Sequence, residues 1–204
     1  NPIGGVEIAG NLLDPDFASF VGLYPIPVRY GLTIGETAQL FNEEYALGAE
    51  LHVVAMQGWQ RSAYWEDTGL PWVPPSPNMP SPETAVVYPG TCFFEGTNIS
   101  EGRGTTKPFE QFGAPFIDGS QLAKTLNGLN LPGVGFRPVF FQPTTGKYTD
   151  EICQGVQVHV LNRTVFDPLC TGLEALATVR RLYPEAFSWR IPQGGIHNFD
   201  RLAG

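Results

Sequence analysis

The residues with the clearest chemical potential lie between Glu95 and Thr105, in the segment Glu-Gly-Thr-Asn-Ile-Ser-Glu-Gly-Arg-Gly-Thr. Its carboxylate, amide, hydroxyl and guanidinium groups offer the many donors and acceptors that a carbohydrate site requires. Glycines at positions 90, 96, 102 and 104 would let the backbone adopt positive φ and approach a ligand closely. The composition is equally consistent with a second interpretation, a rigid structural turn in which Arg103 pairs with Glu95 or Glu101.

Glu95 is the best candidate for a catalytic group. It follows the apolar run Cys92-Phe-Phe94, which could exclude water and favour the protonated form that a general acid needs. Glycoside cleavage normally uses a pair of carboxyl groups, one on each side of the scissile bond. We expect the other nearby carboxylates, Glu101 and Glu110, to be solvated.

The predicted substrate-binding residues combine polar groups with aromatic rings, because sugars present both hydroxyls and apolar C–H faces. They are Thr97, Asn98, Ser100, Arg103, Trp59, Arg61 and Tyr88. Further rings at Tyr64, Trp65 and Trp72 could complete the pocket.

Other chemistries are poorly supported by the sequence. The chain has no phosphate-binding G-x-x-x-x-G-K-[ST] loop and no G-x-S-x-G elbow. Its three cysteines contain no C-x-x-C pair, so neither a metal site nor a disulfide framework is indicated; we expect small buried hydrophobes, with a Cys153–Cys170 bridge as the minor alternative. His52 lies in an apolar run and is expected to be a core histidine. We predict no cofactor.

The formal charge of the chain is −8, from 20 acidic and 12 basic residues. This balance disfavours nucleic acid and anionic membrane surfaces as partners. No apolar run approaches the roughly 20 residues of a membrane helix.

The first half of the chain is predicted to form part of an α/β layer. Thr33 and Glu36 fit a capping box that opens a helix extending to Tyr45. The apolar run 51–56 is typical of a buried strand, with Trp59 and Arg61 just beyond its end. The proline-rich stretch 67–82 is expected to be an ordered surface loop rather than a free tether.

The second half indicates a small α+β unit. A helix is expected near 120–129, followed by strands at 135–141 and 155–161. Asp167-Pro168 would open the longest helix, with an apolar stripe that includes Leu169, Leu173 and Leu176, and Pro184 would end it.

Several ordered blocks of this sequence resemble the NamZ-type exo-β-N-acetylmuramidases. They include Ser19–Glu36, Met56–Arg61, Thr68–Pro80 and Tyr88–Thr105, and the likeness continues through Gly113–Phe116, Leu131–Gly133, Phe136–Pro138, Gly155–Val160 and Arg181–Pro184. The resemblance covers essentially all 204 residues.

The resemblance implies a bacterial peptidoglycan hydrolase, periplasmic or extracellular, that removes terminal N-acetylmuramic acid from the non-reducing ends of peptidoglycan fragments or muropeptide-derived sugars. Residues 1–107 would be the later part of a Rossmann-like domain and residues 108–204 an incomplete, smaller α+β auxiliary domain, with the cleft between them. No metal or cofactor is implied. Arg103, Arg61 or Arg29 could pair with the lactyl carboxylate of the substrate.

The resemblance also implies that the family's Pro-Glu-His-Gly motif, whose Glu is the leading candidate for the catalytic acid, lies outside these 204 residues, as do the family's C-terminal strands. We therefore expect the isolated chain to be inactive. The alternatives are a non-catalytic module that binds peptidoglycan sugars and a structural module that supports a neighbouring hydrolase domain.

Overall fold

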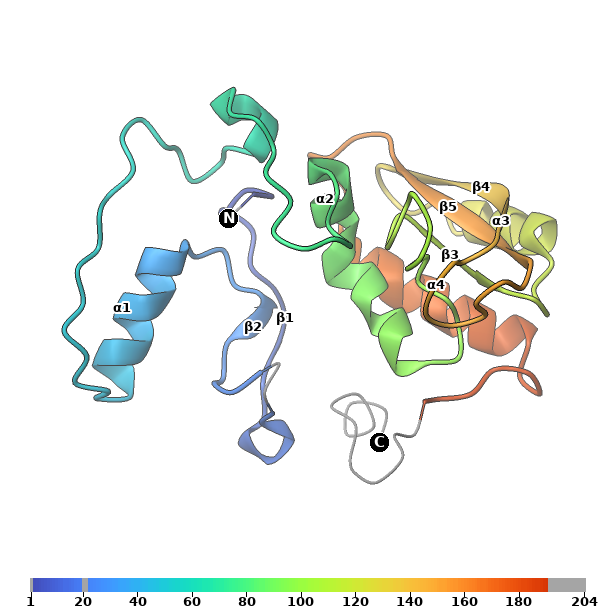
Figure 1. The fold of residues 1–204 in the computed structure, drawn as a ribbon, viewed down its shortest axis with the longest axis horizontal. Coiled ribbons are helices and arrows are strands. Elements are labelled where there is room, and N and C mark those ends of the chain that lie inside the picture. Colours follow the sequence, from blue (N-terminus) through green and yellow to red (C-terminus); the bar gives the residue numbers. More distant parts are fainter. Residues whose placement is uncertain (1, 20–21, 191–204) are drawn as a thin grey trace.

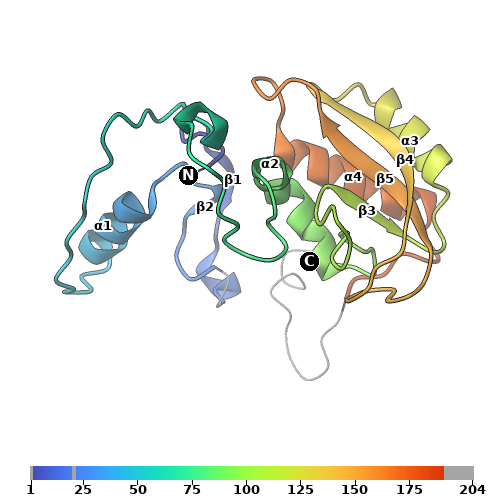
Figure 2. The same cartoon turned by 45° about the horizontal axis from the view of Figure 1, so that its top comes forward.

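The computed structural model describes residues 2–19 and 22–190 as a mixed α/β chain with two small sheets. Figures 1 and 2 show two lobes, with α2 in the C-terminal one. The N-terminal lobe, residues 2–73, contains β1 (Ala9–Leu12), β2 (Pro27–Arg29) and α1 (Ile34–Glu44), with short 3-10 turns at Pro15–Phe17 and Trp65–Thr68. The C-terminal lobe, residues 81–190, contains α2 (Pro82–Thr91), a 3-10 turn η3 (Cys92–Gly96), β3 (Gln111–Ala114), α3 (Gly119–Gly128), β4 (Val134–Phe141), β5 (Cys153–Val160) and α4 (Pro168–Leu182).

The C-terminal lobe holds the hydrophobic core. Its antiparallel sheet has the order β3-β5-β4, with Phe112 opposite Val156 and Phe136 opposite Val158. These side chains are all buried, together with Leu122 of α3. The predicted helix, two strands and final helix are therefore confirmed, and β3 is an additional edge strand that the sequence analysis did not predict.

Helices α2 and α4 pack side by side through glycine. A Cβ atom built on Gly90 of α2 would lie 1.7 Å from the carbonyl oxygen of Pro168, and one built on Gly172 of α4 would lie 2.3 Å from the carbonyl oxygen of Gly90. The two backbones thus approach more closely than any side chain would permit. Gly90 was expected to supply a positive φ, but its place within α2 shows that it serves close helix packing instead.

The predicted stripe of α4 is only partly correct. Leu169 and Leu176 are buried, whereas Leu173 is 52% exposed. The buried face is composed largely of small residues, Thr171, Gly172 and Ala175 among them, because it must fit closely against α2.

Helix α1 begins as predicted. The backbone N–H of Thr33 donates to Oε2 of Glu36 at 2.8 Å, and the N–H of Glu36 donates to Oγ1 of Thr33 at 3.2 Å, which completes a capping box. On the same lobe, the ring of Tyr24 lies 4.5 Å from that of Phe41 and 4.0 Å from that of Tyr45. Aromatic contacts rather than a buried core hold this helix, since none of its residues is buried.

The strand predicted at 51–56 is wrong. These residues have no regular secondary structure and pair with no described strand, and all are exposed: Val54 is 93% exposed and Met56 59%. His52 is likewise exposed, within 3.2 Å of Glu50, and not a core residue. An apolar run becomes a strand only where another strand satisfies its backbone, and the described chain offers none here.

The proline-rich stretch is an ordered loop, as expected. Nε1 of Trp72 donates to the carbonyl oxygen of Met79 at 3.0 Å, and the ring of Trp72 packs edge-on against Trp65 at 5.2 Å. The loop then runs into α2, where Ser81 caps the helix and Pro82 occupies its first turn.

Within the described residues, no helix has the length and apolar character that would let it span a membrane.

Candidate functional site

Glu95 lies at the end of a continuous helical segment. Helix α2 passes directly into η3, which carries Glu95 as its fourth residue and is followed by extended backbone at Thr97. Buried Phe94 stacks on Phe112 of β3 with ring centroids 4.2 Å apart. The carboxylate is therefore anchored by the core on one side and half-buried on the other, with its side chain 27% exposed.

Glu95 belongs to a cluster of four alternating charges. The guanidinium of Arg103 donates from Nε to Oε1 of Glu95 at 3.1 Å and also from Nη2 to the same oxygen. Nε of Arg103 lies 3.2 Å from Oε1 of Glu101, and Oε2 of Glu101 lies 2.8 Å from Nζ of Lys147. The expected pairing of Arg103 with Glu95 or Glu101 is found, and it involves both carboxylates.

Lys147, in the loop between β4 and β5, was not among the predicted site residues. Its Nζ donates to the carbonyl oxygens of Phe94 at 2.7 Å and Ile99 at 2.8 Å, in addition to Glu101. Burial lowers the pKa of this lysine, and the neighbouring Glu101 carboxylate opposes that change. No local pattern marks the residue, because its partners lie about 50 positions earlier in the chain.

Two acids expected to be solvated are buried instead. Glu101 is 5% exposed and pairs with both Arg103 and Lys147. Glu110 is 6% exposed; it accepts from Oγ1 of Thr84 at 2.6 Å and from Nζ of Lys107 at 2.8 Å. A buried carboxylate persists only when such partners replace water, and two of these partners, Lys147 and Thr84, are distant in sequence.

Two glycines shape the turn that carries Arg103. Gly102 has φ +79° and Gly104 has φ +76°, as predicted for these positions. A Cβ on Gly102 would lie 2.7 Å from the carbonyl oxygen of Gln111, so the backbone is closely packed as well as left-handed. The guanidinium is also covered by the Phe109 ring, with Cζ 4.9 Å from the ring centroid.

The predicted polar residues Thr97, Asn98 and Ser100 all bond within the chain. Oγ1 of Thr97 donates to the carbonyl oxygen of Phe94 at 2.9 Å. The amide of Asn98 donates to the carbonyl oxygen of Ala186 at 2.8 Å and accepts from the N–H of Ser188 at 3.0 Å. Oγ of Ser100 accepts from the N–H of Gly102 at 3.2 Å. These contacts fix the segment, and a further contact with substrate remains a prediction.

Trp59 and Arg61 lie in the N-terminal lobe and make no described contact with Glu95. Arg61 donates to the carbonyl oxygen of Gly31 at 2.9 Å and forms an ion pair with Glu36, while its Cζ lies 5.3 Å from the Trp59 ring. Trp65 and Trp72 pack on each other, and Tyr64 packs under Arg163 at 4.4 Å. These aromatic rings of the N-terminal lobe therefore do not gather around the Glu95–Thr105 segment.

Each arginine proposed to bind a substrate carboxylate already has an acidic partner. Arg29 is buried and donates to Oε2 of Glu7 at 2.7 Å, and Arg61 and Arg103 are paired as described above. A substrate carboxylate would therefore have to share a guanidinium with a resident one.

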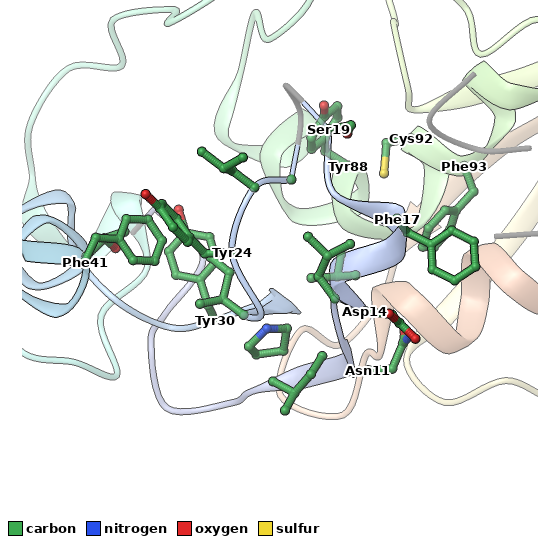
Figure 3. A pocket seen from close by; sticks show the side chains of 18 of the residues that line it. Asn11, Asp14, Phe17, Ser19, Tyr24, Tyr30, Phe41, Tyr88, Cys92 and Phe93 are labelled. Carbon is green, nitrogen blue, oxygen red and sulfur yellow. The ribbon is translucent and has the colours of Figure 1, made fainter. Parts of the chain in front are cut away.

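A pocket of about 940 Å³ connects Glu95 with the N-terminal lobe. Tyr88, Cys92, Phe93 and Glu95 form its wall on the side of α2 and η3. Tyr24, Tyr30 and Phe41 gather on the opposite side (Figure 3). Tyr88 is held by edge-on contact with Phe109 at 4.8 Å. Of the predicted site residues, the structure brings Glu95 and Tyr88 together here, with the paired Arg103 bonded to Glu95.

The cysteines do not all behave as the sequence predicted. All three are free, so the minor alternative of a Cys153–Cys170 bridge is not found. Cys153 is buried as expected, Cys92 is half-buried, and Cys170 is exposed on α4. No cluster of three potential metal ligands occurs within the described part of the chain.

Two family models together match nearly the whole chain. The model described as exo-beta-N-acetylmuramidase NamZ, N-terminal, matches residues 1–83, and the C-terminal model of the same family matches residues 86–204. The predicted domain boundary at residue 107 lies inside the second match and remains a prediction.

The chain is similar to the peptidoglycan beta-N-acetylmuramidase NamZ of Bacillus subtilis (strain 168), with 53% identity over 204 residues. That alignment covers 100% of this chain and 48% of the relative, so the chain spans about half the length of the curated relative that it matches.

The fold is similar to that of two solved DUF1343 family proteins from Bacteroides fragilis NCTC 9343. The first has a TM-score of 0.85 and 40% identity over 91% of this chain and 49% of its own. The second has a TM-score of 0.62 and 26% identity over 90% of this chain and 48% of its own. With family matches at residues 1–83 and 86–204, the chain belongs to the NamZ exo-beta-N-acetylmuramidase family.

Proposed function

We propose that the protein containing this chain is a glycoside hydrolase that removes N-acetylmuramic acid from the non-reducing ends of peptidoglycan fragments, and that the Glu95–Thr105 segment forms one wall of its site. The observation that supports this most directly is the ion pair of Glu95 with Arg103 beside an aromatic-lined pocket, in a chain 53% identical to a peptidoglycan muramidase.

The charge cluster suits Glu95 to one half of the reaction. Hydrolysis breaks the bond between the anomeric carbon and the leaving oxygen, so a proton must reach that oxygen and another must leave the attacking water. A carboxylate fixed by two guanidinium hydrogen bonds is arranged to stabilise the positive charge that develops on the sugar ring. We infer that the principal proton donor is a second carboxyl group, supplied by the part of the full-length protein that these 204 residues do not include.

The substrate-binding residues follow from the same proposal. Tyr88 offers a ring face to the sugar, and Arg103 can share its guanidinium between Glu95 and the lactyl carboxylate. Thr97, Asn98 and Ser100 hold the wall in shape, and Trp59 and Arg61 reach the substrate only from the other lobe. We further propose that residues 1–107 complete a Rossmann-like domain, that residues 108–204 belong to an auxiliary domain, and that the enzyme works in the periplasm or outside the cell.

The decisive test is Glu95→Gln in the full-length protein, assayed on a chromogenic β-glycoside of N-acetylmuramic acid. A carboxylate that acts on the transition state should cost about 10²-fold or more in kcat when it is replaced. Glu174→Gln, which alters an exposed glutamate on α4, should keep wild-type activity. An unchanged kcat for Glu95→Gln would remove Glu95 from the reaction.

The alternative function is a non-catalytic module that binds peptidoglycan sugars. In that case the full-length protein would show no turnover, and Glu95→Gln would change only the affinity for N-acetylmuramic acid measured by calorimetry. A purely structural module would bind no sugar at all. Conversely, turnover by the isolated 204-residue chain would contradict our assignment of the main proton donor to another part of the protein.

A further inference from the structure

A second pocket, of about 740 Å³, is lined in part by Gly104, Thr105 and Thr106, which directly follow Arg103. It is bounded by Gly104–Thr106, by Gln111 of β3, by the end of β4 with the loop after it at 140–145, and by Pro77-Asn78 of the proline-rich loop. It shares no lining residue with the pocket at Glu95. The same short turn therefore contributes Arg103 to the Glu95 cluster and Gly104 to this second hollow.

Backbone contacts hold two of the walls together. The carbonyl oxygen of Gly104 accepts from both the N–H and the Oγ1 of Thr144, each at 2.9 Å. A Cβ on Gly104 would lie 2.5 Å from the nitrogen of Thr145, so the two segments touch backbone to backbone. Nε2 of Gln142 donates to the carbonyl oxygen of Asp150 at 2.8 Å and fixes the loop from its far end. The pocket is thus formed before any ligand arrives, which lowers the entropic cost of binding.

The lining is polar and uncharged. None of the residues that border the pocket is acidic, basic or a histidine. The side chains of Asn78, Thr106 and Thr145 form no hydrogen bond with another described residue, which leaves one amide and two hydroxyls able to bind a ligand. Beside them Phe140 presents a ring that is 69% exposed.

This combination selects one class of ligand. A phosphate, a carboxylate or a metal ion would meet no opposite charge here, and a purely apolar ligand would leave the amide and hydroxyls without partners. A neutral sugar satisfies both requirements, because its hydroxyls bond to side-chain amides and hydroxyls while a C–H face packs on an aromatic ring. An acetamido group adds a donor and an acceptor that a carboxamide such as that of Asn78 can match in pairs.

We propose that this pocket binds an uncharged N-acetylhexosamine unit of the glycan. This inference rests on the proposed function. The muramic acid, which carries a carboxylate, would lie beside Arg103 in the pocket at Glu95. The neutral sugar of the same glycan would lie in the pocket formed by Gly104, Thr106 and Phe140.

The test uses the full-length protein and N-acetylglucosamine as the probe, with binding followed by ligand-observed saturation-transfer NMR and titration calorimetry. Phe140→Ala and Asn78→Ala should each weaken binding about tenfold, the loss expected for one ring contact or one paired amide. Leu161→Ala is the matched control: Leu161 is 74% exposed but follows β5, at the opposite end of the β4–β5 pair from Phe140. Thermal midpoints of all three variants report whether each is folded.

The outcomes separate this proposal from the muramidase activity. Binding of N-acetylglucosamine that falls in both pocket variants and not in Leu161→Ala supports the pocket, even if no hydrolysis is detected. Equal binding by wild type and both folded pocket variants, or no binding by an active wild-type enzyme, would overturn it while leaving the hydrolase assignment intact.

Discussion

Lys147 and Glu101, 46 residues apart in sequence, lie with Nζ and Oε2 only 2.8 Å from each other. The same ammonium group also bonds to the carbonyl oxygens of Phe94 and Ile99, which lie on either side of the segment that includes Glu95. The position of the candidate catalytic carboxylate therefore depends on a side chain from the β4–β5 loop. One buried lysine connects the loop, the charge cluster and the end of η3.

Replacement of this lysine should destabilise the protein strongly. Lys147→Met removes a buried donor from the Glu101 carboxylate, which keeps Arg103, and from the carbonyl oxygens of Phe94 and Ile99. We expect a loss of about 2 kcal/mol or more in the free energy of unfolding. Urea-induced unfolding of the variant and of wild type measures this difference in stability. Lys124→Met, at an exposed position on α3, should change stability by less than about 0.5 kcal/mol. Equal midpoints for the two variants would show that the buried contacts contribute nothing.

The close approach of α2 and α4 predicts an unusual sensitivity to one methyl group. Gly90→Ala would place Cβ 1.7 Å from the carbonyl oxygen of Pro168, so the helices must separate at a cost of about 1–3 kcal/mol. Gly128→Ala, at the end of α3, meets nothing within 4 Å and should be neutral or slightly stabilising. Thermal unfolding followed by circular dichroism distinguishes the two, and a Gly90→Ala variant as stable as wild type would rule out the close contact.

The N-terminal lobe should respond to acid through Glu36. The Arg61 guanidinium and the N–H of Thr33 lower the pKa of Glu36 from 4.5 to about 2. Since the folded pKa lies below the unfolded one, the stabilisation is present above pH 4.5 and is lost as the pH falls towards 2. In Glu36→Gln the side-chain amide oxygen can still accept the N–H of Thr33, but the side chain cannot titrate. The thermal midpoint of this variant should therefore fall less steeply than that of wild type across this pH interval. Glu44→Gln, at an exposed position on the same helix, should follow wild type; parallel curves for Glu36→Gln and wild type would contradict the assignment.

The three thiols should differ sharply in reactivity. Burial raises the pKa of Cys92 to about 12 and that of Cys153 to about 11, whereas Cys170 is exposed on α4. Because the thiolate is the reactive form, a thiol-specific disulfide reagent at mildly alkaline pH should modify Cys170 first. Cys170→Ser should abolish that fast phase, and denaturant should expose the remaining thiols. A fast phase that persists in Cys170→Ser would contradict the burial of the other two.

Local signals explain which elements were predictable. The capping box at Thr33 and the Asp167-Pro168 start of α4 depend on neighbouring residues, and both helices begin where these patterns place them. Helix α2 has an equally local start at Ser81-Pro82, yet no helix was predicted there, and it contains Pro89 and Gly90 near its end. The composition of that end reflects contact with α4, which no local pattern reveals.

The candidate site was predictable only in part, for a related reason. Glu95 and Arg103 are eight residues apart, and their pairing was one of the interpretations that the segment allowed. The burial of Glu101 and Glu110 depends on Lys147 and Thr84, which approach through the fold, so charge alone suggested solvation. The neutral pocket beside Gly104 likewise combines residues from separate parts of the chain, and its lining could not be inferred from any one of them.

The exposed run 51–56 bears on how the protein can be handled in solution. It pairs with no described strand and is free of proline, and Val54 is almost fully accessible. Segments of this kind are where sheets between separate molecules begin to grow. We expect the 204-residue chain to self-associate as its concentration rises, with light scattering suppressed by Val54→Lys. The solubility of this chain is thus expected to depend on six residues that lie outside the site.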